Sequence, residues 1–344
     1  MRPVSLARAA IGPGQPVFIV AEIGGNFTTY EEAVSLIDYA KVCGVDAVKL
    51  QTFKAHTLAS RRAMFDMENT GRVSQYELFL KYQIDESLHR RIFEHATLKD
   101  VMIFSTPSAH DDVDFLESLH IPAYKIGSDD AANLPFLQYV AQKHKPVILS
   151  TGMCTMEEVR EAVSTILATG NEQLILLHCV SSYPARAREV NLRAIQTMAQ
   201  EFDVPTGYSD HAIGNEICLA AVAIGAHLIE KHFTLDKHAN GPDHRLSADP
   251  TDLVGLVKGI RAIEAALGNG IKRPASSEES PRRNNRKGVV AVRSIPRGQK
   301  ITREMIGIKR PGIGIAPKDL EVVIGRAARV DIPAEASVTW EMVE

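Results

Sequence analysis

The stretch AVKLQTF at residues 47–53 is a short, apolar, β-rich run that ends in polar side chains and follows a helix-like segment at 30–43. Runs of the same kind recur along the chain, with helical patterns between them, at residues 17–24, 101–107, 123–128, 146–152, 174–180, 205–210 and 227–234. Consecutive strands joined by helices must run parallel, and eight such units can close on themselves. The sequence therefore predicts an α/β fold, a (β/α)8 TIM barrel.

The connections between these runs bear on the choice of fold. An open doubly wound sheet is the alternative, but that fold usually carries a GxGxxG turn after its first strand, and EIGGNF at residues 22–27 does not match it. Residues 54–82 are long and polar for a simple connection. They are expected to form a βα loop over the barrel mouth, where a loop can act as a substrate lid.

The composition is that of an ordinary globular protein, with 45% hydrophobic and 24% charged residues among 344. It excludes collagen, coiled coils and wholesale disorder. The net charge of −3 attracts neither nucleic acid nor acidic lipid, so the expected partner is a small molecule. The four cysteines form no CxxC pair and no apolar leader follows Met1, which favours a cytoplasmic protein with no membrane segment.

Reactive side chains end almost every predicted strand. In a barrel these carboxyl ends surround one mouth, where such enzymes place their chemistry. Because side chains alternate along a strand, Lys49 and Gln51 share a face, as do Glu230 and His232. The pattern predicts a catalytic pocket.

His211 and His232 end the seventh and eighth predicted strands, which are neighbours in a barrel. Their imidazoles could share a metal ion and leave positions open for substrate, and such a site would suit Mn²⁺, Fe²⁺ or Zn²⁺ better than Ca²⁺. The alternative is a pair of neutral core histidines.

Lys49 and Lys125 lie within apolar strands, where a lysine is either an anion clamp or a Schiff-base nucleophile. Several hydroxyl groups accompany them and make the surroundings suitable for a phosphate or a carboxylate: Thr106, Ser128, Ser181, Ser182 and Ser209. The pattern indicates an anionic substrate.

Two carboxylates leave their roles open. Glu22 ends FIVAEIG, where burial could raise its pKa for acid or base catalysis, although a structural carboxylate that binds loop amides fits equally well. Asp243, in the loop NGPDHRLS, could contact a ligand or simply be solvated.

The chain changes character after residue 267. Gly, Pro, Ser and charged residues indicate a linker at 274–285, between a barrel domain at 1–273 and a small domain at 286–344. SIPRGQKITREMI, starting at Ser294, is echoed by DIPAEASVTWEMV, starting at Asp331, which predicts a pseudo-symmetric, β-rich module. Between the two copies, KRPGIG forms either a rigid loop that presents Arg310 or an ordinary turn.

Together these motifs resemble the sialic acid synthase family over almost the whole chain, and the C-terminal module is similar to the antifreeze-like (SAF) domain of that family. The motifs are VAEIGGN at 20, AVKLQTF at 47, FSTP at 104, YKIGS at 124, ILSTGM at 148, LLHCVSSYP at 176, GYSDH at 207, EKHFT at 230, GPD at 241 and KRPGIG at 309.

The resemblance implies a transferase that condenses phosphoenolpyruvate with an N-acylated amino sugar such as N-acetylmannosamine, giving a nine-carbon 2-keto acid and phosphate. It also implies Mn²⁺ or Mg²⁺ on His211 and His232, with Glu22 as the acid or base. The residues that it assigns to phosphoenolpyruvate are Lys49, Gln51, Thr106, Lys125, Ser128, Ser181 and Ser209. Those that it assigns to the sugar are Asp130, Tyr183, Asp243 and Arg310, the last entering from the partner subunit of a domain-swapped homodimer.

Three departures from the family pattern leave the sugar specificity open, and the first falls on a position that the resemblance assigns to the sugar. The chain has GSDD at Asp130 where GSGE is common, Phe27 where a histidine often follows Asn26, and Ser181 where an asparagine often stands. Legionaminic or pseudaminic acid synthases, or other surface-polysaccharide synthases, therefore stay open as alternatives. A Schiff-base pyruvate aldolase and a non-catalytic sugar-phosphate binding protein are the alternatives of another class.

Overall fold

The computed structural model describes residues 1–68 and 70–344 of the chain, which divide into two compact units, Met1–Gly268 and Asn269–Glu344. The first unit confirms the predicted barrel. Its eight parallel strands pair in chain order, and the last pairs with the first: β3 Phe18–Glu22, β4 Ala47–Thr52, β7 Met102–Pro107, β8 Tyr124–Ile126, β9 Val147–Ser150, β10 Leu174–Cys179, β11 Thr206–Asp210 and β12 Leu228–His232.

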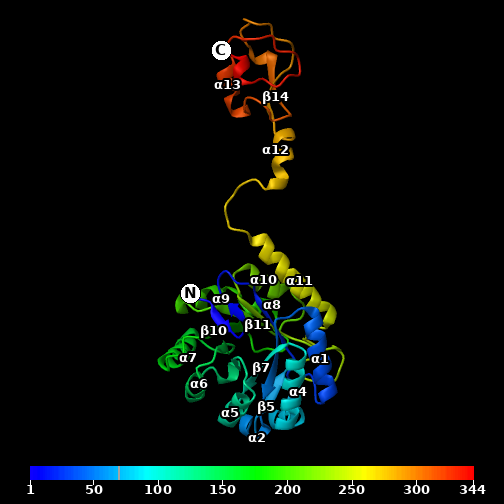
Figure 1. Cartoon of the computed structure of the whole chain (residues 1–344), viewed down its shortest axis with the longest axis vertical. Helices are drawn as coiled ribbons and strands as arrows, with labels where there is room; N and C mark the ends of the chain where they lie inside the picture. Colours follow the sequence, from blue (N-terminus) through cyan, green and yellow to red (C-terminus); the bar gives the residue numbers. More distant parts are fainter. Residues whose placement is uncertain (69) are drawn as a thin grey trace. The chain divides into compact units, whose positions relative to one another are not determined.

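One long helix follows each barrel strand and packs outside it (Figure 1). These helices are α1 Tyr30–Cys43, α4 Glu86–Leu98, α5 His110–Ser118, α6 Leu134–Ala141, α7 Met156–Ala168, α9 Arg193–Phe202, α10 Glu216–Ala223 and α11 Pro250–Leu267, with the short α8 Ala187–Val190 before α9. Local chemistry fixes where helix α7 begins, because the Thr155 hydroxyl accepts from Glu158 N and the Glu158 carboxylate accepts from Thr155 N. No helix in the described parts of the chain has the length and apolarity that a membrane span needs.

Apolar side chains fill the barrel on two levels. Outward-facing strand residues such as Ile19 and Val48 pack against the helices, and inward-facing ones such as Val20 and Phe104 form a separate core. The antiparallel hairpin of β1 (Val4–Leu6) and β2 (Ala9–Ile11) adds Leu6 to that inner core. Polar strand residues are therefore left to the opposite, carboxyl-terminal end.

The connection after β4 has more structure than a loop. Residues 54–82 contain helix α2 (Ala55–Leu58), a hairpin of β5 (Met64–Met67) and β6 (Gly71–Ser74), and helix α3 (Gln75–Tyr82). We call this segment the lid. The expected lid loop is thus a helix, a hairpin and a second helix, apart from residue 69, which lies outside the described residues.

The second unit has a small core of its own. Strands β13 (Gly288–Ala291) and β14 (Ile306–Lys309) are antiparallel, and the remaining elements are α12 Glu279–Asn284, α13 Leu320–Val323 and the 3-10 turns at Ser276–Glu278, Arg303–Met305, Pro317–Asp319 and Trp340–Met342. Ile295 and Ile332, equivalent residues of the two sequence copies, exchange backbone hydrogen bonds of 2.8 and 2.9 Å. This reciprocal pairing joins the repeats. The predicted linker at 274–285 falls inside this unit and includes α12.

Candidate active site

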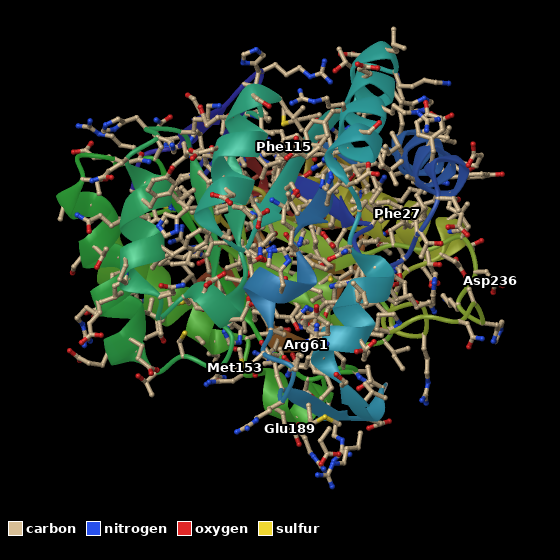
Figure 2. All side chains as sticks on the ribbon, turned by 90° about the horizontal axis from the view of Figure 1, so that it is seen from below. Phe27, Arg61, Phe115, Met153, Glu189 and Asp236 are labelled. Carbon is tan, nitrogen blue, oxygen red and sulfur yellow. The ribbon has the colours of Figure 1, made fainter. Side chains whose placement is uncertain are left out.

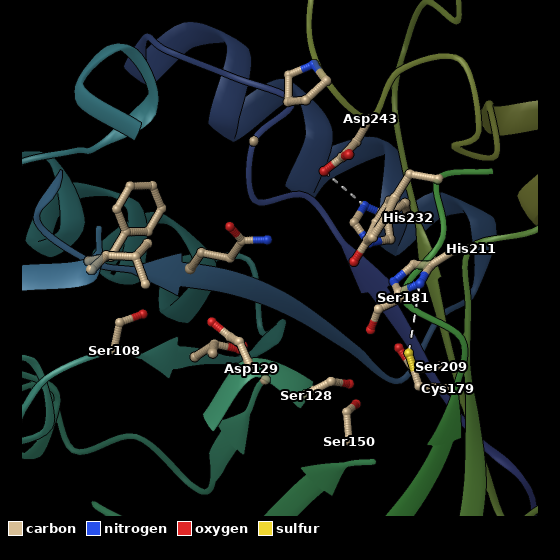
Figure 3. Close-up of a pocket in the computed structure, with 18 of the residues that line it drawn as sticks. Ser108, Ser128, Asp129, Ser150, Cys179, Ser181, Ser209, His211, His232 and Asp243 are labelled. Carbon is tan, nitrogen blue, oxygen red and sulfur yellow. Dashed lines mark hydrogen bonds and ion pairs between the residues drawn. The ribbon is translucent and has the colours of Figure 1, made fainter. Parts of the chain in front are cut away.

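A cavity of about 520 Å³ opens at the carboxyl ends of the barrel strands, between the strand ends and the lid. Figure 3 shows its labelled serines and histidines converging from separate strands and loops. Eleven of the residues predicted for the site line this cavity: Lys49, Gln51, Thr106, Lys125, Ser128, Ser181, Tyr183, Ser209, His211, His232 and Asp243. Side chains far apart in the sequence thus meet in one space.

Opposite charges alternate at the floor of the cavity and directly behind it. Lys49 Nζ lies 2.7 Å from Glu22 Oε2 and 3.6 Å from Glu230 Oε1, and the Nζ of Lys125 lies 3.6 Å from the same Glu230 oxygen. All four side chains are at most 6% exposed. Buried charged groups such as these need partners of opposite charge. Because Lys49 and Lys125 also line the cavity, their ammonium groups can bind an anionic ligand there.

Hydroxyl groups complete the floor. Lys125 Nζ donates to Ser150 Oγ at 2.7 Å, and Lys49 Nζ lies 3.4 Å from Thr106 Oγ1. The Ser128 hydroxyl accepts from the backbone N–H of Gly152, which fixes its position at the cavity wall. Two ammonium groups among several hydroxyls are a suitable cradle for a phosphate and a carboxylate.

Glu22 is buried behind the floor and does not itself line the cavity. Its Oε1 accepts a 3.0 Å hydrogen bond from Gln51 Nε2, so both Gln51 and Lys49 stand between it and the open space. Burial raises the pKa of the Glu22 carboxyl to about 7, although Lys49 opposes this shift. A carboxyl group that titrates near neutral pH can take up or release a proton during a reaction.

The two predicted histidines are neighbours, with ring centroids 5.3 Å apart. Backbone bonding orients His211, whose Nδ1 donates to the Val180 carbonyl at 2.8 Å and leaves Nε2 for another partner. His232 Nδ1 is buried, has no hydrogen-bond partner among the described residues, and lies 3.5 Å from Asp243 Oδ2. The ring of Tyr183 lies 4.1 Å from that of His211.

This donor set fits a divalent cation. Burial lowers the pKa of His232 and keeps the imidazole neutral, which is the form that binds metals. Burial also opposes protonation of His211, but the neighbouring Cys179 raises its pKa to about 9, so a cation there would have to displace a proton. Among the described residues, no three histidine, cysteine or carboxylate side chains form a complete ligand cluster. Substrate and water would supply the remaining positions.

Two predicted sugar contacts are not among the residues that line the cavity within the barrel unit. Asp130 does not line the cavity; its Oδ1 accepts from Asn133 Nδ2 at 2.9 Å, and the preceding residue, Asp129, lines the cavity instead. Arg310 follows β14 in the second unit, which is described by itself, so its relation to the cavity stays a prediction. Phe27, labelled in Figure 2, is buried in the apolar core between strands and helices.

Sequence reasoning assigned no role to three groups of lining residues. Glu230 lies between the two lysines and accepts a hydrogen bond from Ser209 Oγ at 3.1 Å. The sequence signal that could have given it a role was its position two residues before His232, on the same face of β12. Ser150 and Cys179 also end strands. The lid contributes an apolar group that no strand pattern indicated: Leu58, Phe65, Leu78 and Phe79.

A sequence model described as the NeuB family matches residues 36–272, more than half of the chain. The chain belongs to the NeuB family. A model of the SAF domain matches residues 286–344, the predicted C-terminal module. The predicted resemblance to sialic acid synthases and the barrel followed by a SAF domain are both confirmed.

Relatives of this NeuB-family chain include synthases. The N,N'-diacetyllegionaminic acid synthase of Legionella pneumophila is 40% identical over 342 residues, which cover 97% of this chain and 96% of that protein. The human N-acetylneuraminate-9-phosphate synthase is 34% identical over 345 residues, covering 97% and 94%. The crystal structure of the N-acetylneuraminic acid (sialic acid) synthetase from Leptospira borgpetersenii, with citrate, is 33% identical with a TM-score of 0.74, over 81% of this chain and 95% of that one.

Proposed function

We propose that this chain condenses phosphoenolpyruvate with an N-acylated amino sugar, such as N-acetylmannosamine or a legionaminic or pseudaminic acid precursor, and releases phosphate. The observation that carries the proposal is the meeting of Lys49, Lys125 and several hydroxyls with the His211–His232 pair in one cavity. The names of the relatives support it, since one is an N,N'-diacetyllegionaminic acid synthase and another an N-acetylneuraminate-9-phosphate synthase.

The floor would bind phosphoenolpyruvate. Lys49 and Lys125 would face its phosphate and carboxylate, and the hydroxyls of Ser128 and Ser209 would donate to the same oxygens. Carbon C3 of phosphoenolpyruvate then bonds to the aldehyde carbon of the open-chain sugar, whose oxygen takes a proton. Water adds at C2 and passes one proton to a base. The bond between C2 and the phosphate oxygen then breaks, the remaining hydroxyl proton leaves with the phosphate, and C2 becomes the keto carbon.

His211 and His232 would hold a divalent cation, Mn²⁺ or Mg²⁺, and such an ion supplies a Lewis acid that polarises a carbonyl oxygen. The buried Nδ1 of His232, which has no hydrogen-bond partner among the described residues, supports this assignment. Asp243, beside His232, and Tyr183, packed on His211, would hold the sugar in position next to the pair.

With Mn²⁺ present, we expect phosphate release from phosphoenolpyruvate only when an acceptor is added, within a panel of N-acylated mannosamines and 2,4-diacetamido sugars. Exhaustive chelation should lower the rate by at least about 100-fold, because Lewis-acid stabilisation amounts to several kcal/mol, and added Mn²⁺ should restore it. A phosphate-release assay with and without acceptor measures both effects. Full turnover after chelation would contradict the metal requirement, and no release with any acceptor would favour a binding protein.

A Schiff-base aldolase is the second candidate, because Lys125 has the properties of such a nucleophile. Burial lowers the pKa of its ammonium, and the residue faces the cavity. However, Lys125 Nζ already donates to Ser150 Oγ and lies near Glu230. We therefore expect no covalent adduct when the protein is treated with pyruvate and borohydride and then weighed by mass spectrometry. A stable adduct on Lys125 would favour the aldolase.

We also propose that Arg310 closes the cavity of a partner subunit in a domain-swapped homodimer. Arg310→Ala should raise the KM for the sugar by about 10-fold or more, the cost of losing a charged hydrogen bond, and leave the KM for phosphoenolpyruvate and the unfolding midpoint unchanged. Arg329→Ala, at another exposed arginine of the same unit, is the matched control. An unchanged KM for the sugar in the Arg310→Ala variant would indicate that the SAF domain serves assembly alone.

A further inference from the structure

The cavity has two sides of different chemistry. Its floor, formed by the strand ends, carries lysines, carboxylates, hydroxyls and imidazoles. Its lid side is lined by large apolar side chains that come from the end of β4 and from the lid: Phe53, Leu58, Phe65, Leu78 and Phe79. We call these five residues the apolar wall.

Ring contacts hold the apolar wall together. Phe79 meets Phe53 at 5.3 Å between ring centroids and Phe65 at 5.6 Å, both edge to face. The aromatic group therefore belongs to one packed surface that connects helix α3 to hairpin β5–β6 and to the end of β4.

Three polar side chains on the lid side each donate a hydrogen bond within the protein. Gln75 Nε2 donates to the Met64 carbonyl, Thr70 Oγ1 to the Gly71 carbonyl, and Tyr82 OH to the Asn240 carbonyl. These donors are therefore not free for a ligand, and the large side chains that a ligand meets on this side are apolar.

The described residues of the barrel unit place no lysine or arginine on the lid side of the cavity. Among the described residues of the barrel unit, Lys49 and Lys125 are the only lysines or arginines that line the cavity, and both lie on the floor. Arg61 of the lid instead stacks on Tyr76, 4.5 Å from its ring centre, and donates to the Tyr76 hydroxyl. A phosphate placed against the apolar wall would lose its hydration without gaining a partner from this unit.

We infer that the acceptor sugar carries no phosphate at the end far from its carbonyl, and that this end bears apolar groups that pack on the apolar wall. The inference rests on the proposed condensation, in which the carbonyl must approach the His211–His232 pair and the floor-bound phosphoenolpyruvate. The rest of the acceptor then extends away from the floor, toward the lid. For an N-acylated hexosamine the far end is carbon 6.

Three acceptors that differ only at carbon 6 test this inference: N-acetylmannosamine, its 6-deoxy form and its 6-phosphate. We expect kcat/KM to rise about 3- to 10-fold when the 6-hydroxyl is removed, because a methyl group is buried without stranding a polar group. The 6-phosphate should react at least about 100-fold more slowly than the 6-hydroxyl form. Phosphate release by the full-length protein with Mn²⁺ measures all three rates.

Two variants on helix α3 locate the effect. Leu78→Gln places an amide in the apolar wall and should reduce the preference for the 6-deoxy acceptor to within about twofold. Leu80→Gln makes the same change at a residue that is 47% exposed and does not line the cavity, so its preference should match the unmodified protein. Because each preference is a ratio within one preparation, partial misfolding does not alter it.

The outcomes separate this inference from the proposed function. Equal or faster reaction of the 6-phosphate, or equal rates for all three acceptors, would overturn the inference and leave the condensation intact. The same preference in Leu78→Gln as in the unmodified protein would overturn the role of the apolar wall. Phosphate release with none of the acceptors, the 2,4-diacetamido sugars included, would overturn the condensation, and the inference with it.

Discussion

Replacing Lys231 with methionine is expected to lower the free energy of unfolding by about 3–5 kcal/mol, because the change leaves a buried carboxylate without its counter-charge. Lys231 Nζ lies 2.7 Å from Asp210 Oδ2, and the two side chains are 1% and 0% exposed. Lys231 also donates to the Ala212 carbonyl, so the substitution strands a second acceptor.

The Asp210 carboxylate is the centre of a buried network that adjoins the histidine pair. It accepts from Tyr208 OH at 2.9 Å, from Ala212 N at 2.8 Å and from Cys218 Sγ at 3.1 Å, in addition to Lys231. Asp210 directly precedes His211, and Lys231 directly precedes His232. The ion pair between Asp210 and Lys231 therefore joins β11 to β12 next to both histidines. We therefore expect kcat/KM to fall by about 10- to 100-fold in Lys231→Met, as for other residues that orient ligands.

Denaturant unfolding followed by circular dichroism measures the stability effect. The double variant Asp210→Asn, Lys231→Met should recover part of the loss, since it leaves no buried charge unpaired. Arg160→Gln, which breaks the exposed pairs of Arg160 with Glu157 and Glu201, is the surface control and should cost no more than about 1 kcal/mol. A loss below about 1 kcal/mol in Lys231→Met would show that the pair contributes little.

The barrel could be predicted because its signal is local and repeated. Each strand is a short apolar run, and topology then forces the polar residues that end the strands to one side. Lys125 and Ser209 are 84 positions apart in the sequence. Each could nevertheless be placed in the same cavity from its own strand, because every strand ends at the same mouth. The start of helix α7 can likewise be predicted from the sequence, because Thr155 and Glu158 have the spacing of a capping box.

Side-chain direction outside the strands could not be predicted in this way. Residues 128–130 form a single 3-10 turn, in which Asp129 lines the cavity and Asp130 accepts a hydrogen bond from Asn133. The sequence GSDD does not indicate which of the two aspartates faces the cavity. The lid hairpin was missed because its strands are short and half-polar, so their pairing depends on tertiary contacts such as Phe65 on Phe79.

Glu230, which lies between Lys49 and Lys125, is a second carboxylate that could exchange a proton with the substrate. Glu230 lines the cavity, whereas Glu22 lies behind Lys49. The Oε2 atom of Glu230 has no hydrogen-bond partner among the described residues. Titration distinguishes the two. Burial opposes ionisation of Glu230, but Lys125 and Lys49 outweigh it and lower the pKa of that carboxyl below its usual range, while the pKa of Glu22 is raised to about 7.

If Glu22 is the base, kcat/KM should rise with pH up to about 7, because only the ionised carboxylate accepts a proton, and should then level off. Glu22→Gln should lower kcat by about 100- to 10,000-fold and remove this rise. Glu230→Gln should also lower kcat but keep the rise, since Glu230 is already ionised at neutral pH. Asp46→Asn, at a part-buried carboxyl with a raised pKa that does not line the cavity, should leave the profile unchanged. A rise that persists in Glu22→Gln and disappears in Glu230→Gln would reassign the proton transfer to Glu230.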